Sequence, residues 1–310
     1  MSQIIAKSSH WPGFEGIRRL FIFGDSYSSV FWSHTGFSPS SHPTAQHPLG
    51  TPFPGSTFNE EDLPNWVGHL ITKYCPAPRY DPSTDDQEDG FADDPLLVYN
   101  YARGGDQVSG VARQIRRLFL PIVGTKPEWA PWSENDSLFV TSVGINDCAV
   151  SREGDFPLRI SLLMELQEEL YANGARNFLF FDVPPIDMAP AIAEKRIQYG
   201  IEVDPSQETQ FQKWNSLLLA AIRDFQSKHP DCTILVYSLY EMFSVVLDDL
   251  DTYGFPPSHK HISNGTVWLD HIHPTSKIHD LIAHFLCDFL NEVPKYEPEE
   301  DTATKEDTAE

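Results

Sequence analysis

Near its amino terminus the chain reads Phe21-Ile22-Phe23-Gly24-Asp25-Ser26-Tyr27, a compact apolar run that ends abruptly in polar residues. Four later segments repeat the apolar part of this pattern. They show little polar alternation, which is typical of strands buried on both faces of a parallel sheet. We therefore predict five strands, at Arg19–Phe23, Leu96–Tyr101, Ser137–Val143, Asn177–Val183 and Thr233–Ser238.

Helical patterns separate the predicted strands. The segment Phe156–Ala172 places apolar residues three and four apart, Asp106 and Asp204-Pro205 are typical of helix starts, and a last helix runs from about Ser276. This alternation indicates an α/β fold, a three-layer α/β/α sandwich with a five-stranded, mostly parallel sheet. The longest irregular stretch, Ser33–Phe58, is either a functional loop or a surface insertion.

The charge balance is strongly acidic, with 22 Lys and Arg against 45 Asp and Glu and a net charge of −23. We expect no nucleic-acid partner and no binding to an anionic membrane surface, because no basic stripe can neutralise phosphates. No segment reaches the roughly 18 apolar residues of a membrane helix. We assign residues 1–295 to a single domain. Residues 296–310, which hold seven acids and one base, form an acidic tail that we expect to be disordered.

Cysteine usage and the amino terminus bear on the compartment. Cys75, Cys148, Cys232 and Cys287 lie far apart, most of them in apolar contexts, which favours buried free thiols over disulfides or zinc. The segment Met1–Gly16 lacks the apolar core of a secretory signal. Both features predict a cytoplasmic protein, and secretion stays open if a leader has been removed.

Polar residues and glycines follow the first three predicted strands. In an open α/β sheet, ligands bind beyond the carboxyl ends of the strands. Ser26 stands there, although a serine at this place is more often a helix cap. Asn146 can donate uncharged hydrogen bonds, as an oxyanion hole requires. Gly105 lets a backbone N–H approach a ligand, and it opens a helix whose amino end favours negative charge. Ordinary turn chemistry is the alternative for Asn146 and Gly105.

A second polar motif, Asp270-His271-Ile272-His273, precedes the last predicted helix. Asp270 and His273 are three residues apart, a spacing at which a carboxylate can hold an imidazole in one tautomer while its other nitrogen faces a nucleophile. The alternative is a metal site, because six histidines lie between His259 and His284. Zinc needs three or four convergent ligands, and no familiar ligand pattern is completed here, so we expect no metal.

Taken together, the motifs Gly-Asp-Ser, Gly, Gly-x-Asn-Asp and Asp-x-x-His run in this order from Phe21 to Pro274. This set resembles the GDSL-type serine hydrolases of the SGNH superfamily. The Gly-Asp-Ser-Tyr start and the Asn-Tyr-Ala-x-Gly-Gly block are most similar to fungal acetylesterases of carbohydrate esterase family sixteen. Two residues depart from the usual pattern, Arg103 and Asp106, and either could reshape the acyl pocket.

The resemblance implies a flavodoxin-like topology and a role for each motif. Ser26 would be the nucleophile, His273 the general base and then acid, and Asp270 the residue that orients His273. The oxyanion hole would comprise the backbone N–H groups of Ser26 and Gly105 and the side chain of Asn146. Gly105 is preferred to its neighbour Gly104 because it lies five residues after the asparagine of its block, as in the family.

The implied activity is hydrolysis of short-chain acyl esters, above all acetyl esters of carbohydrates, through an acyl-enzyme. The substrate would be a small-molecule or oligosaccharide ester, and Asp25, Tyr27, Trp32 and Arg103 are candidate contacts to it. A longer-chain lipase or thioesterase is one alternative, and a catalytically inactive binding protein of the same fold is another. We expect no cofactor, because neither a P-loop nor a Gly-x-Gly-x-x-Gly motif is complete.

Overall fold

The computed structural model describes residues 1–30, 42–84, 92–201, 204 and 206–298. Its strands form one sheet in the order β1-β6-β5-β4-β2-β3. Neighbouring strands are parallel except β1, which pairs with β6 in the antiparallel direction. The strands are β1 (Gln3–Ala6), β2 (Arg19–Gly24), β3 (Leu97–Asn100), β4 (Ser137–Ser142), β5 (Asn177–Phe181) and β6 (Thr233–Tyr237).

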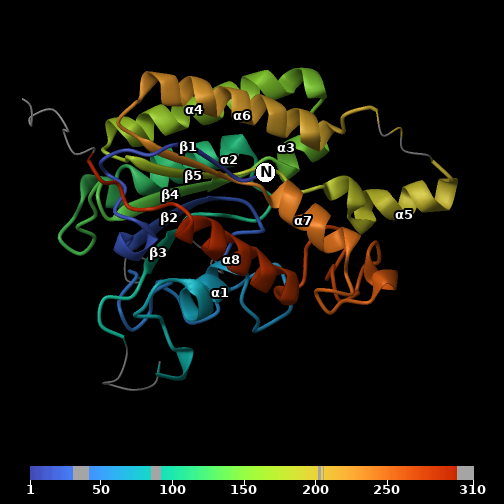
Figure 1. Cartoon of the computed structure of the whole chain (residues 1–310), viewed down its shortest axis with the longest axis horizontal. Coiled ribbons are helices and arrows are strands. Elements are labelled where there is room, and N and C mark those ends of the chain that lie inside the picture. The colour runs from blue at the N-terminus through green and yellow to red at the C-terminus, as the bar shows by residue number, and fades with distance from the viewer. Residues whose placement is uncertain (31–41, 85–91, 202–203, 205, 299–310) are drawn as a thin grey trace, which may run out of the picture.

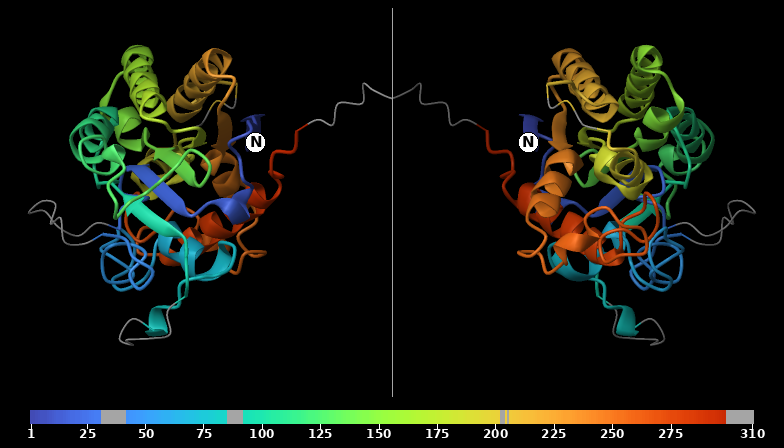
Figure 2. Two further views of the ribbon diagram at one scale, coloured as in Figure 1. Left: turned by 90° about the vertical axis from the view of Figure 1, so that its left-hand side faces the viewer. Right: turned by 90° about the vertical axis from the view of Figure 1, so that its right-hand side faces the viewer.

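Helices cover both faces of the sheet (Figure 1). On one face α4 and α6 lie side by side, with α2 and α3 against them, and on the other α1 packs against α8 (Figure 2). The α-helices of the described residues are α1 (Trp66–His69), α2 (Val108–Arg113), α3 (Ile145–Val150), α4 (Phe156–Ala172), α5 (Pro190–Tyr199), α6 (Gln210–Lys228), α7 (Leu239–Asp248) and α8 (Ser276–Asn291). A π-helical turn extends α1 over Leu70–Tyr74 and another extends α2 over Gln114–Phe119.

The predicted three-layer fold is confirmed, with one strand more than the five expected. The parallel strands follow the flavodoxin-like order, so the topology reverses between β2 and β4, where such sheets bind ligands. The sixth strand is β1, in which Ile4 is 46% exposed. Such a short, half-exposed edge strand lacks the continuous apolar run that is typical of the buried strands. Its pairing with residues 234–236 cannot be predicted from the residues around it.

Two predicted helix starts are wrong. Helix α6 begins at Gln210, not at Asp204, because Thr209 accepts a hydrogen bond from the Gln212 N–H while the Gln212 side chain accepts one from the Thr209 N–H. This capping box satisfies two amide donors and outcompetes the Asp-Pro signal. Helix α2 begins at Val108, and its cap is Gln107 rather than Asp106. Helices α4 and α8 begin at Phe156 and Ser276, as predicted.

Candidate active site

The predicted catalytic side chains meet beyond the carboxyl end of β2. Ser26 is the second residue after that strand and is only 8% exposed. The Nε2 atom of His273 lies 3.0 Å from Ser26 Oγ, and its Nδ1 atom lies 2.7 Å from Asp270 Oδ2. The structure thus brings a hydroxyl, an imidazole and a carboxylate into one hydrogen-bonded line, although the serine and the histidine are 247 residues apart.

The turn that carries Asp270 and His273 is held by its own backbone. Asp270 Oδ1 accepts hydrogen bonds from the N–H groups of Ile272 and His273, both at 2.8 Å, which leaves Oδ2 for the imidazole. The Tyr27 hydroxyl donates to the Ile272 carbonyl at 2.7 Å and ties this turn to the segment after Ser26. Partial burial raises the pKa of Asp270, but the hydrogen bonds from His273 and Ile272 outweigh it and hold that pKa below its ordinary value. Asp270 is therefore ionised at neutral pH.

The residues predicted to form an oxyanion hole lie at the same edge of the sheet. The Arg103 N–H donates to the Gly24 carbonyl at 3.1 Å, so Gly104 and Gly105 follow just beyond the end of β2. Gly105 has a φ of +78°, which favours glycine, and it lies in the turn before α2 rather than at its first residue. The Asn146 side chain, in the first turn of α3, donates to the Asp106 carbonyl at 3.0 Å.

Residues 20–286 match the family of GDSL-like lipases and acylhydrolases. The chain belongs to this family. It is 30% identical over 298 residues to an acetylesterase from Thermothelomyces thermophilus, covering 87% of each chain.

Two solved structures are among those similar to this GDSL hydrolase. An acetyl xylan esterase from Geobacillus stearothermophilus gives a TM-score of 0.47 at 13% identity, covering 88% of this chain and 94% of that one. A lipase/acylhydrolase from Enterococcus faecalis gives 0.43 at 13% identity, covering 89% and 96%.

Three polar residues that the sequence analysis did not single out hold the edge of the site. Gln114 accepts from the Gly24 N–H at 2.9 Å and donates to the Gly24 carbonyl at 2.8 Å, which fixes the backbone just before Ser26. Asp147 is fully buried, accepts from the Val108 N–H at 3.1 Å and pairs with Arg159 at 3.0 Å. This carboxylate therefore links the first turns of α2 and α3, between which the predicted oxyanion donors lie.

Asp106, predicted to cap α2, instead directs its mostly buried carboxylate along the helix. It binds the Arg113 guanidinium at 2.9 Å and the Gln114 amide at 2.8 Å. A capping side chain would accept from an N–H group in the first turn of α2, but the Val108 N–H of that turn donates to Asp147 of the neighbouring helix. A tertiary partner thus replaces the local cap.

The candidate substrate contacts occupy different places. Asp25 and Tyr27 are buried, 1% and 2% exposed, so both lie beneath the site and support it. Arg103 is exposed beside the glycine turn, where a substrate can reach it. Trp32 lies outside the described residues. In the described ranges, no group of three or more His, Cys, Asp or Glu side chains is placed to hold a metal ion.

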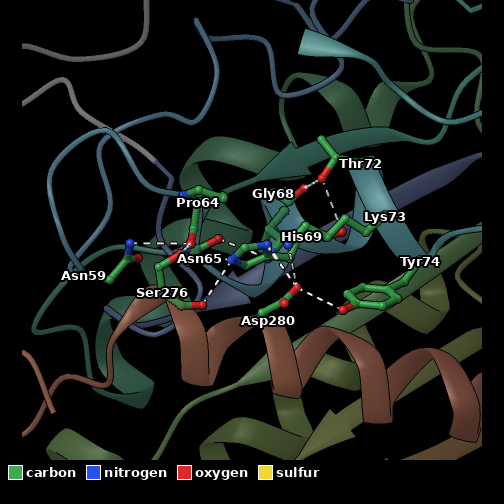
Figure 3. Close-up of polar contacts among 11 residues, drawn as sticks. Asn59, Pro64, Asn65, Gly68, His69, Thr72, Lys73, Tyr74, Ser276 and Asp280 are labelled. Carbon is green, nitrogen blue, oxygen red and sulfur yellow. Dashed lines mark hydrogen bonds and ion pairs between the residues drawn. The ribbon is translucent and has the colours of Figure 1, made fainter. Parts of the chain in front are cut away.

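A second serine, histidine and carboxylate lie in a row between α1 and α8 (Figure 3). His69 Nε2 lies 2.9 Å from Ser276 Oγ, and its Nδ1 lies 3.2 Å from Asp280 Oδ1. The Ser276 hydroxyl donates to the Pro64 carbonyl at 2.6 Å, and both His69 and Ser276 are buried. Burial lowers the pKa of His69 to about 4 in spite of Asp280. This cluster is closed to substrate, and it fastens α1 to the first residue of α8, three positions after His273.

The Asn146 amide is open to a direct test. Asn146→Ala is expected to lower kcat by about 10²–10³, the usual effect of removing one oxyanion donor. Initial rates on p-nitrophenyl acetate measure this loss. The matched control is Asn135→Ala, because Asn135 is exposed and lies just before the amino end of β4. Turnover close to wild type in the Asn146 variant would refute its assignment to the oxyanion hole.

Asp25 gives a prediction about stability and pH. Burial, with Asp147 and Asp106 nearby, raises the pKa of Asp25 to about 7. The folded state therefore binds more protons than the unfolded state between pH 4 and 7, and this contribution to stability is lost as the pH rises through that window. Asp25→Asn keeps an acceptor for the Tyr27 N–H but cannot ionise.

We expect the Asn variant to gain stability relative to wild type as the pH rises from 4.5 to 8, by at most about 4 kcal/mol. Urea unfolding of both proteins at several pH values measures the difference. A difference that does not change with pH contradicts the raised pKa.

Proposed function

We propose that this GDSL hydrolase is an acetylesterase that acts on carbohydrate esters with Ser26 as its nucleophile. One observation carries the proposal: the hydrogen-bonded line from Asp270 through His273 to Ser26 Oγ. The 30% identity to a protein named acetylesterase favours a short acyl group over the longer chains of a lipase or thioesterase. The carbohydrate part rests on the resemblance of the Gly-Asp-Ser-Tyr and Asn-Tyr-Ala-x-Gly-Gly motifs.

The proposed reaction is acyl transfer in two halves. His273 Nε2 accepts the Ser26 proton as Oγ attacks the ester carbonyl, and the carbonyl oxygen becomes an oxyanion that faces the Ser26 and Gly105 N–H groups and the Asn146 amide. Collapse of this intermediate expels the alcohol, which takes the proton from His273. Water, activated by the same imidazole, then attacks the acyl-enzyme and releases the acid. Asp270 stays ionised throughout and stabilises the imidazolium.

Initial rates on p-nitrophenyl acetate, butyrate and octanoate test the proposed acyl preference, with Ser26→Ala as the blank. We expect a rate that falls steeply with chain length and is absent from the variant. A preference for octanoate would assign the protein to the lipases or thioesterases. Activity that survives in Ser26→Ala would refute the assignment of Ser26 as the nucleophile.

The remaining assignments stand as predictions. Within the described residues, no helix is long and apolar enough to cross a membrane. We propose a cytoplasmic location and a division into a domain of residues 1–295 and a tail of residues 296–310. Residues 299–310 of this tail lie outside the described part of the chain.

A further inference from the structure

An exposed aromatic side chain lies directly on the base of the proposed triad. The ring of Phe58 stacks on the His273 imidazole with a centroid distance of 5.2 Å and an interplanar angle of 29°. The end of the same ring abuts Gly104 so closely that it leaves no room for a Cβ there. Phe58 therefore spans the gap between the imidazole and the glycine turn that precedes α2.

The position of Phe58 is fixed by its neighbours in the chain. Asn59 donates from its side chain to the Leu63 carbonyl at 2.8 Å. Glu60 accepts a hydrogen bond from the Ser276 N–H at 2.6 Å, which anchors this segment to the first residue of α8. The segment that carries Phe58 is thus held both by its own turn and by the helix after His273.

Phe58 is nevertheless 40% exposed. Large apolar side chains that are exposed beside a polar site are candidates for ligand contact, since burying them against a ligand is favourable. One face of the ring is already taken by His273, and its tip by Gly104. The exposed part is left for a ligand.

The chemistry of ester cleavage decides which part of the ligand this is. His273 must deliver a proton to the oxygen of the departing alcohol, so that oxygen comes within hydrogen-bond reach of Nε2. The alcohol portion of the ester consequently lies beside the imidazole, whereas the oxyanion points toward Gly105 and Asn146. A ring that stacks on the imidazole borders the alcohol side of the site.

We propose that Phe58 forms the alcohol-binding subsite and that its exposed surface packs against a sugar ring. The proposal rests on the proposed function, whose substrates are carbohydrate esters. An aromatic ring suits this role because a pyranose presents apolar C–H groups on its faces, which pack against an aromatic face while the hydroxyl groups stay in water.

The test compares two acetyl esters that differ only in the alcohol: ethyl acetate and a mono-O-acetylated methyl β-xylopyranoside. p-Nitrophenyl acetate is avoided, because its own aromatic ring can stack on Phe58. For Phe58→Ala we expect kcat/KM on the xyloside ester to fall about five- to tenfold, mainly through KM, and on ethyl acetate to change less than twofold. Phe58→Tyr is expected to restore the rate on the xyloside ester.

The control variant is Tyr199→Ala, which removes an aromatic side chain that is 70% exposed at the last residue of α5. We expect it to leave both rates unchanged. Equal losses on both esters in Phe58→Ala would mean that Phe58 acts only through His273, and this would overturn the subsite. So would unchanged rates on both esters, or a wild-type enzyme that does not favour the xyloside ester over ethyl acetate. A wild-type enzyme that cleaves neither ester would refute the proposed function itself.

Discussion

Ser26→Ala is expected to lower kcat on p-nitrophenyl acetate by about 10⁶, the scale seen when the nucleophile of a serine hydrolase is removed. The reason is structural: Ser26 Oγ is the atom that His273 Nε2 contacts at 3.0 Å, and alanine leaves the imidazole nothing to activate. Stopped-flow and steady-state rates measure the loss, together with the absence of a burst of p-nitrophenol. Thermal unfolding of the variant shows whether its fold is intact.

The matched control for Ser26 is Ser28→Ala. Ser28 is buried two residues away, but its hydroxyl accepts from the Trp66 indole N–H at 3.1 Å and has no part in the proposed line. We expect this variant to lose stability and keep its activity within about tenfold. A loss in Ser28→Ala as deep as that in Ser26→Ala would contradict the choice of nucleophile.

The two histidines of the motif give a further control. His273→Ala should match the loss of Ser26→Ala, and the double variant should be no worse, because the two residues act as a unit. His271 has a side chain that is 69% exposed, and its Nδ1 lies 3.8 Å from Asp270 Oδ1. His271→Ala is therefore expected to keep most of the activity, and equal losses in both histidine variants would contradict the choice of His273.

How much of the site can be predicted from the sequence depends on how local its signals are. Ser26, Asn146 and the Asp270–His273 pair stand in short motifs at the ends of predicted elements, so the topology alone brings them to one edge of the sheet. The hydrogen bonds that support these residues have no such local signal, because they join positions far apart in the chain. Asp147 meets the Val108 N–H across 39 residues, Gln114 meets Gly24 across 90, and His69 meets Ser276 across 207.

The same distinction explains the strand that the sequence analysis missed. The buried parallel strands can be recognised in the sequence as apolar runs, whereas β1 is stabilised by pairing with β6 more than 200 residues away. The sequence offers two local caps for α6, at Asp204 and at Thr209. The helix starts after Thr209, whose capping box forms two hydrogen bonds. Phe58 lies at the end of an irregular stretch, and its contact with His273 becomes visible only in the folded chain.

Asp270→Asn is expected to lower kcat by about 10⁴ without unfolding the protein. The asparagine Oδ1 can still accept from the Ile272 and His273 N–H groups, so the turn keeps its shape. Its Nδ2, however, replaces the Oδ2 that lies 2.7 Å from His273 Nδ1, and an amide donor there favours the tautomer with the proton on Nε2. That proton then faces Ser26 Oγ, and the imidazole cannot act as a base.

The tautomer explanation is distinct from a loss of structure or charge alone, and two measurements separate them. Urea unfolding of Asp270→Asn should stay close to wild type, because both backbone hydrogen bonds survive. A ¹⁵N spectrum of the histidine side chains should show the His273 proton on Nδ1 in the wild type and on Nε2 in the variant. A variant that keeps its proton on Nδ1 and more than a tenth of its activity would show that Asp270 does not set the tautomer. Retained activity would also imply that the hydrogen bonds that lower the pKa of Asp270 stabilise the turn and do not contribute to the reaction.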